Sequence, residues 1–249
     1  TDNYPMTSAM SFCGTQEEAE LLVHWAMEEA EWQGDAGEVN DDAGKGHTGE
    51  AVGGPTTEIS SPAIDNGDSG TCRYGSFDGN GQYLKGDNSG SYLEGLQGVT
   101  VMAWVKNTGE VGNDRGIFTT GDDPGVKDNR LGLRYDSEGY FSGESNVLKA
   151  SINTTNCPDD GECLQVETEG GVQTQDEWQH VAMTWASGGR IRVYVNGDEK
   201  VGAVSHAVSD GDTEGVHDGE LDAIETLRVG QGTKQGNPEW QGNIDEFRI

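Results

Sequence analysis

Three carboxylates in the segment ELDAIE have a spacing at which they could act together. Glu220, Asp222 and Glu225 follow an E-x-D-x-x-E pattern. Retaining glycoside hydrolysis needs two carboxyl groups about 5–5.5 Å apart, one acting as an acid and the other as a nucleophile. Alternate residues of a strand share a face, so Glu220 and Asp222 would point to the same side. Glu225 would join them only through a β-bulge.

The surroundings of this segment argue against catalysis. Laminarinases and related retaining glucanases carry a signature of this shape with a polar, glycine-containing context, whereas residues 226–232 here read TLRVGQG. The turn-rich stretch SDGDTEGVHDG at 209–219 precedes it, which places the carboxylates at a junction between loop and strand. With 45 acidic residues, a chance match is easy. We therefore expect no enzyme activity, and keep a retaining glucanase as the alternative.

The charge of the chain restricts its partners. Acidic residues outnumber basic ones 45 to 15, giving a net charge of −30 over 249 residues. Such a charge repels nucleic-acid backbones and anionic membranes. The sequence holds no apolar run long enough for membrane insertion, and its first ten residues lack the features of a secretory signal. The acidity indicates a marine or halophilic source, or a calcium-rich protein whose carboxylates are partly neutralised by ions.

The cysteines predict an extracytoplasmic location. The chain has four, Cys13, Cys72, Cys157 and Cys163. An even number in an acidic, glycine-rich chain favours disulfides and an oxidising compartment, at the cell surface or outside the cell. Cys157 and Cys163 bracket the turn sequence PDDGE, so we pair them, which leaves Cys13 with Cys72. The spacing does not fit a zinc site.

Alternating hydrophobicity predicts an all-β fold. Residues 99–107 place Val99, Val101, Ala103 and Val105 on one face. Two runs at 190–204 flank Asn196-Gly197, the pair typical of a two-residue hairpin turn. In 177–186 the residues Trp178, Val181, Met183 and Trp185 are expected in the core, with His180 on the other face. The segment from Leu21 is expected to be a strand. About a dozen short strands favour one antiparallel β-sandwich.

The final segment, GNIDEFRI, has an irregular pattern. Strict alternation from Ile249 includes Phe247 but not Ile244, so the phase slips by one residue between them. A β-bulge at Asp245-Glu246 would restore the pattern and redirect a carboxylate.

Four motifs, in order, resemble the laminin G-like version of the concanavalin A-like jelly roll. They are LLVHWAMEE (21–29), VNDDAGKGHTG (39–49), WQHVAMTWASGGRIRVYVNG (178–197) and WQGNIDEFRI (240–249). The resemblance covers 21–249, which we take as one domain after a lead-in at 1–20 tied by Cys13. EVNDDAGKGHTG together with TCRYGSFDG is most similar to the version in biogenesis proteins of the mannose-sensitive haemagglutinin pilus of marine bacteria.

The resemblance implies a structural calcium ion that joins the first strand, the glycine-rich loop and the last strand. Its ligands here would be Glu29, Asp41 and Asp245, completed by loop carbonyls, since calcium takes six to eight oxygen ligands. Lys45 departs from the family pattern, and its ammonium would compete with the ion if it reached the site. The alternative is that these carboxylates are solvated on an acidic surface.

A second acidic stretch predicts a ligand-binding loop at 119–136. It contains Asp122, Asp123, Asp128, Asn129 and Arg130. Loops at the rim of a sandwich often gather ligand groups, and sugars need planar carboxylate, amide and guanidinium groups beside an aromatic ring. Arg134 and Tyr135 follow in the next strand, while an ordinary solvated loop is the alternative.

These observations together predict an adhesion module, an antiparallel jelly-roll β-sandwich with structural calcium. We expect it to be part of a larger surface protein and to bind a glycan or a cell-surface or matrix protein. A purely structural spacer is the other alternative.

Overall fold

The computed structural model describes most of the chain. The described residues are 19–60, 63–64, 71–109, 114–121, 131–139, 142–157, 164–200, 204–207, 216–232 and 239–249. Their strands pair antiparallel, and no helix among them is long and apolar enough to cross a membrane. Because residues 1–18 lie outside this set, the predicted lead-in at 1–20 stays a prediction.

The described strands form two eight-stranded sheets and one small sheet. Sheet A has the order β14 (Asp198–Glu199), β13 (Arg192–Val195), β11 (Gln179–Ala186), β6 (Gly98–Asn107), β18 (Gln241–Arg248), β4 (Tyr74–Asp78) and β3 (Thr56–Glu58), and β1 (His24–Trp25) also pairs with β18. Sheet B has the order β15 (Val204–Ala207), β10 (Leu164–Glu167), β9 (Ser145–Ile152), β8 (Gly132–Glu138), β7 (Arg115–Thr119), β17 (Leu227–Val229), β5 (Tyr83–Gly86) and β2 (Gly49–Val52). β12 (Gly189–Arg190) pairs with β16 (Val216–His217), and α1 (Gly90–Leu93) is a single turn.

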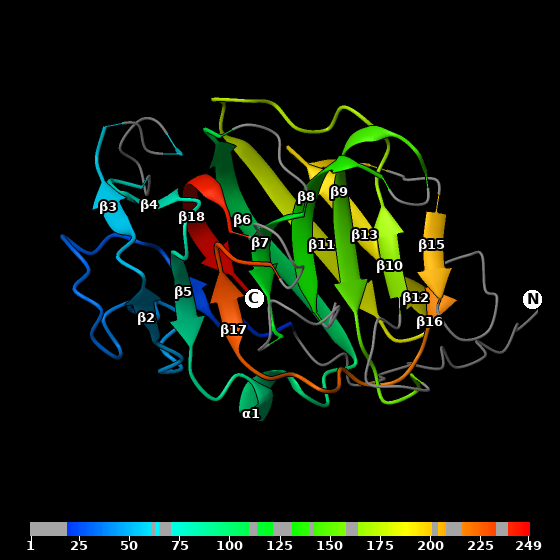
Figure 1. Cartoon of the computed structure of the whole chain (residues 1–249). Helices are drawn as coiled ribbons and strands as arrows, with labels where there is room; N and C mark the ends of the chain where they lie inside the picture. The colour runs from blue at the N-terminus through cyan, green and yellow to red at the C-terminus, as the bar shows by residue number, and fades with distance from the viewer. Residues whose placement is uncertain are drawn as a thin grey trace, which may run out of the picture.

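The two sheets pack face to face as a sandwich, with β8 to β10 in front of β6, β11 and β13 in the view of Figure 1. Alternate residues of facing strands fill the space between them, among them Val101 of β6 and Leu148 of β9. Phe247 joins the layers, because its ring lies 5.8 Å from that of Trp25 and 5.7 Å from that of Phe118. The predicted jelly-roll sandwich is confirmed.

Local chain geometry confirms two predictions. Asn196 and Gly197 have φ angles of 52° and 85° and join β13 to β14, as a turn that requires positive φ at both positions does. The register of β18 against β6 shifts between Asp245 and Arg248, and Glu246 has a φ of 52°. The bulge lies where the slip in the hydrophobic pattern put it.

Two predictions need correction. The strand expected from Leu21 onward is only two residues long, although Leu22 and Val23 donate to the carbonyl of Ile249. It ends early because Met27 has a left-handed φ of 59°. Trp178 is half-buried outside the core, because it lies out of phase with Val181 and the inward residues of β11. Its ring packs at a steep angle against that of Tyr74, with the ring centroids 5.5 Å apart.

Candidate functional site

Asp41, a predicted calcium ligand, organises the glycine-rich loop. Its Oδ1 accepts the backbone N–H groups of His24 at 3.0 Å and Ala43 at 3.1 Å. Its Oδ2 accepts those of Lys45 at 3.1 Å and His47 at 3.0 Å. Partial burial alone would raise the pKa of Asp41, but these four donors outweigh it and hold that pKa below its usual range. The four lone-pair sites of the carboxylate are thereby used by three N–H groups of the loop and by that of His24 in β1.

The carboxylate of Glu29 also accepts hydrogen bonds from within the protein. Oε1 accepts the backbone N–H of Asn40 at 2.7 Å and its side-chain amide at 3.0 Å. Oε2 accepts the indole N–H of Trp32 at 3.2 Å. The ammonium of Lys45 pairs with Glu20 at the surface.

Asp245 is different, because its carboxylate is fully buried and neither oxygen has a hydrogen-bond partner of standard geometry. It lies opposite Trp104 at the start of the bulge. Burial, with a smaller effect of Glu246, raises the pKa of Asp245 to about 7. Thr71 and the backbone of Ala63 act in the opposite direction and do not outweigh the burial. A buried carboxylate without partners is costly, and a bound cation is one way to offset that cost.

In the described part of the chain, no group of three or more His, Cys, Asp or Glu side chains could hold a metal ion. The structure therefore does not bring Glu29, Asp41 and Asp245 into one such ligand group. Calcium binding stays a prediction, and Asp245 is the predicted ligand whose two oxygens have no hydrogen bond of standard geometry.

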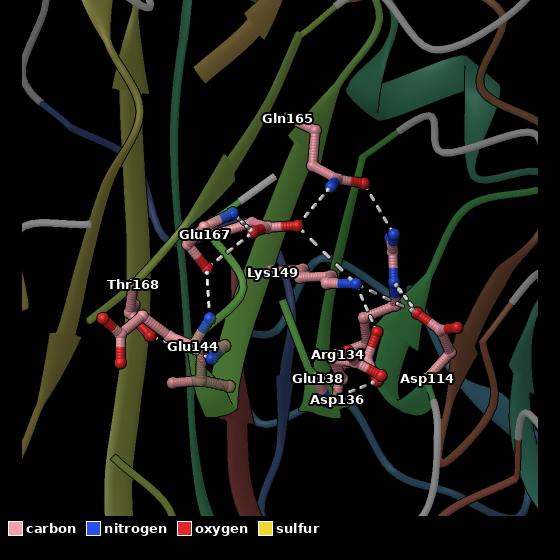
Figure 2. Close-up of polar contacts among 11 residues, drawn as sticks. Asp114, Arg134, Asp136, Glu138, Glu144, Lys149, Gln165, Glu167 and Thr168 are labelled. Carbon is pink, nitrogen blue, oxygen red and sulfur yellow. Dashed lines mark hydrogen bonds and ion pairs between the residues drawn. The ribbon is translucent and has the colours of Figure 1, made fainter. Parts of the chain in front are cut away.

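A cluster of ionic and polar side chains lies on sheet B, on the face opposite the core residues of β8 and β9. Figure 2 shows its polar contacts. We call it the charged layer; its members are Asp114, Arg134, Asp136, Lys149, Gln165 and Glu167, each between 0% and 8% exposed. Along β8 and β9 they alternate with core residues such as Tyr135 and Leu148. Six polar residues are thus buried on the face of sheet B opposite the core.

Lys149 is at the centre of the charged layer. Its Nζ forms an ion pair with Asp136, lies 3.6 Å from Oε1 of Glu167 and lies 4.0 Å from Oδ1 of Asp114. Arg134 donates from Nε to Asp114 at 2.7 Å and from Nη2 to Oε1 of Gln165 at 2.6 Å. The amide of Gln165 in turn donates to Glu167 at 3.4 Å. Figure 2 shows these contacts. Ion pairs that share partners in this way hold each side chain in one orientation.

Sequence reasoning missed the charged layer. Arg134, Asp136 and Glu138 at alternate positions of β8 look like the solvent-facing side of an ordinary strand, as does Lys149 on β9. Nothing in the pattern marks those that belong to the layer as buried. Arg134, which follows the predicted ligand-binding loop in sequence, lies within the layer. Tyr135 points into the core, where its hydroxyl contacts Oε1 of Gln179 at 3.1 Å and its ring stacks on Trp240.

The five residues of the predicted ligand-binding loop, Asp122, Asp123, Asp128, Asn129 and Arg130, lie outside the described residues. That prediction stays untested. In sequence they fall between Thr119, the last residue of β7, and Gly132, the first of β8.

The carboxylates of ELDAIE do not lie along a strand. Glu220 and Asp222 are exposed, Glu225 is half-buried, and β17 begins only at Leu227. A left-handed φ of 56° at Ala223 breaks the extended backbone between them. Oε1 of Glu220 accepts the side-chain amide of Gln97 at 3.2 Å.

The cysteines follow the prediction only in part. Cys72 is a free, exposed thiol, so its assignment by elimination to a bridge with Cys13 is wrong. A surface thiol needs no partner, and the Cys72 backbone is held instead by Glu28, which accepts its N–H at 2.6 Å. Cys157 is disulfide-bonded. Because Cys163 lies outside the described residues, that pairing stays a prediction.

A comparison with protein-family models identifies the family. The model described as the concanavalin A-like lectin/glucanases superfamily, of the laminin G type, matches residues 78–249. The chain belongs to this superfamily. That result agrees with the resemblance of the motifs from β4 to β18, while the narrower likeness to pilus biogenesis proteins is not shown.

Solved structures with a similar fold include binding domains of bacterial toxins. The binding domain of Paraclostridial Mosquitocidal Protein 1 matches with a TM-score of 0.54 and 12% identity, over 92% of this chain and 48% of that one. The botulinum neurotoxin serotype D binding domain matches with a TM-score of 0.52 and 14% identity, over 92% and 47%. This chain thus spans about half of each. At such low identity the likeness concerns the fold, and no curated protein matches the chain.

Proposed function

We propose that this chain is a non-enzymatic binding module that recognises a glycan or a protein at a cell surface. Its superfamily combines lectins with glucanases, so the question is which of the two activities fits. The observation that carries the proposal is the layout of ELDAIE, where two exposed carboxylates and a backbone break replace a catalytic strand. Two carboxyl groups that hydrolyse a glycosidic bond must be held at a fixed separation, and the one that acts as the general acid must keep its proton.

The charged layer supports the proposal through rigidity. Its side chains are buried and held by each other, which fixes β8, β9 and β10 relative to one another. A rigid sheet loses little conformational entropy when a ligand binds to the module.

Binding and hydrolysis are separated by two measurements on the same protein. We expect the chain to be retained on a glycan array or by a panel of matrix proteins, and to release no reducing ends from laminarin. Reducing-sugar release that Glu220→Gln or Glu225→Gln abolishes would establish the glucanase instead. A chain that neither binds nor cleaves would be a structural spacer.

We also propose that calcium stabilises the module, with Asp245 as its anchoring carboxylate. The support is the pair of unpartnered oxygens in a fully buried side chain. Calcium would supply the positive charge that the carboxylate lacks and complete its shell with oxygen atoms.

The calcium proposal is tested by thermal melts in calcium and in chelator. Calcium should raise the Tm of the wild type and of Glu29→Gln, whose carboxylate is already used by Asn40 and Trp32. It should leave the Tm of Asp245→Asn unchanged. Equal Tm values of the wild type in calcium and in chelator would refute the calcium proposal.

We further propose that the module is part of a larger surface protein of a marine Gram-negative bacterium, of the pilus-associated kind. The support is the pair of motifs around Asp41 and Tyr74 together with the acidic composition. Antibody labelling of intact cells that produce the protein tests surface display, and labelling only after lysis would refute it.

A further inference from the structure

A groove of about 640 Å³ lies at the end of sheet A where β6 begins and where β11 and β18 end. We call it the apolar groove. Its volume is within the range that is typical of binding pockets. Most of the side chains that line it are apolar, among them Leu21, Leu22, Leu96, Met102, Trp185 and Ile249.

Leu21 presents apolar surface to solvent in this groove. It is 43% exposed, and in the described part of the chain the other exposed large hydrophobic residues are Ile59 and Val216. The backbone beside Leu21 is fixed, because Leu22 donates its N–H to the carbonyl of Ile249 at 2.8 Å. Apolar surface in contact with water is unfavourable, so a partner that covers the groove gains free energy without having to reorganise this backbone.

The rim of the apolar groove carries negative charge. Glu20 is one of the lining residues, and its side chain is 61% exposed. Its ion-pair partner, Lys45, is itself 40% exposed. Exposed Glu220 accepts the side-chain amide of Gln97, another lining residue, at 3.2 Å. Exposed ion pairs contribute little to stability, so a cation of a partner can replace Lys45 at little cost.

The charges around the groove disfavour an anionic partner. Arg248 is the cationic residue among those that line it, and its guanidinium is paired with Glu246. The chain as a whole carries a net charge of −30. Such a field attracts cations and repels anions before any contact is made. A partner that combines apolar side chains with positive charge therefore fits both the lining and the rim.

We propose that the apolar groove binds a segment of a partner protein in which apolar side chains are flanked by Lys or Arg. The apolar side chains would cover Leu21 and its neighbours in the groove, and the basic ones would pair with Glu20 and Glu220. This inference rests on the proposed binding function. It deepens that function by naming the surface and the chemistry of a protein ligand.

The test uses two groove variants, each with a matched control. Leu21→Ser removes the exposed apolar side chain, and Glu20→Gln removes a carboxylate of the rim. The adjacent residues Glu58 and Ile59 repeat this pair of a glutamate and an exposed apolar residue, and neither lines the groove. Glu58→Gln and Ile59→Ser are therefore the controls.

The probes are three short peptides of one pattern, titrated calorimetrically into the full chain at physiological ionic strength. The first is built of leucine and lysine. A serine–lysine peptide keeps the positive charge without the apolar side chains, and a leucine–glutamate peptide keeps the apolar side chains with the opposite charge. These two comparisons separate specific binding from general attraction to an acidic protein.

We expect the leucine–lysine peptide to bind at least roughly tenfold more tightly than either comparison. Leu21→Ser should weaken its affinity by roughly three- to tenfold, because the contact with an apolar side chain is lost. Glu20→Gln should weaken it by roughly two- to threefold. Glu58→Gln and Ile59→Ser should stay within about twofold of the wild type.

Several results would overturn the inference. Equal affinities for the leucine–lysine and serine–lysine peptides would reduce the binding to charge alone, and equal affinities for the leucine–lysine and leucine–glutamate peptides would remove the role of charge. Unchanged affinity in Leu21→Ser and Glu20→Gln would place peptide binding elsewhere. In all of these cases, retention on the glycan array or by matrix proteins would leave the proposed function standing, and its absence there would refute both.

Two other occupants of the groove are distinguishable in the same protein. A wild type that sediments as a dimer, and that Leu21→Ser converts to a monomer, would assign the groove to a second copy of the chain. Residues 1–18, which precede the lining residue Ala19, contain Phe12. If Phe12→Ser strengthened peptide binding, the groove would be assigned to that segment of the chain instead of to a partner.

Discussion

Nζ of Lys149 lies 3.6 Å from Oε1 of Glu167, across the pair formed by β9 and β10, and both side chains are almost completely buried. Asp136 pairs with the same ammonium from β8. One cation thus links three strands on the face of sheet B that does not contact the core. Retaining buried charge on a sheet is costly unless every charge is paired.

Replacing Lys149 by an uncharged residue should strongly destabilise the fold. Lys149→Met leaves Asp136 and Glu167 buried without it, which should lower the free energy of unfolding by about 3–5 kcal/mol in urea titrations. The solvent-accessible pair of Lys85 and Asp87, 3.1 Å apart, is the control, and Lys85→Met should cost less than about 1 kcal/mol. Similar small losses in both variants would contradict the role of Lys149.

Asp41 should matter for the stability of the loop whether or not calcium binds. Asp41→Ala removes the acceptor of four backbone N–H groups, with an expected loss of about 2–4 kcal/mol in the free energy of unfolding. Asp42→Ala, at the exposed neighbouring position, should change it by less than about 0.5 kcal/mol. Both variants are measured in the presence of chelator, so that calcium does not contribute. Equal changes in the free energy of unfolding would show that the loop does not depend on Asp41.

His180 should make the protein less stable in mild acid. Burial, assisted by Arg248, lowers the pKa of His180 below 6.5 in the folded state. Below pH 6.5 the unfolded chain therefore takes up a proton that the folded chain does not bind. The Tm of the wild type should fall relative to that of His180→Gln as the pH drops below 6.5, and parallel Tm curves would disprove this.

Salt should stabilise the fold through its acidic surface. A net charge of −30 repels itself in dilute buffer, and the Debye length shrinks to about 3 Å at 1 M salt. A relief of about 2 kcal/mol would raise the Tm by roughly 4–8 °C. Sorbitol of equal osmolality is the uncharged control. A Tm that rises equally in sorbitol would assign the effect to excluded solute instead of screening.

The sequence predicted those features that depend on the order of neighbouring residues. The alternation around Val101 placed β6 with its inward face, and Asn196-Gly197 fixed a turn because few other pairs adopt positive φ at both positions. The slip between Ile244 and Phe247 located the bulge, since a side-chain period of two can be broken only by an inserted residue.

Burial of polar groups was decided by the tertiary structure. Lys149 and Ser151 look like solvent-facing positions along β9, and their burial depends on what lies over the strand, which the local pattern does not encode. The three predicted calcium ligands were grouped by motif order. The structure shows that Asp41 and Glu29 satisfy their carboxylates within the chain, while Asp245 does not.

The sequence by itself determined the sandwich, its inward faces, one hairpin and one bulge, because hydrophobic period and turn chemistry act between residues close along the chain. Only the tertiary structure decided which charges share partners and which buried carboxylate has no hydrogen bond of standard geometry. Those relations join strands far apart in sequence, and the free energy of a polar group depends on its surroundings in space.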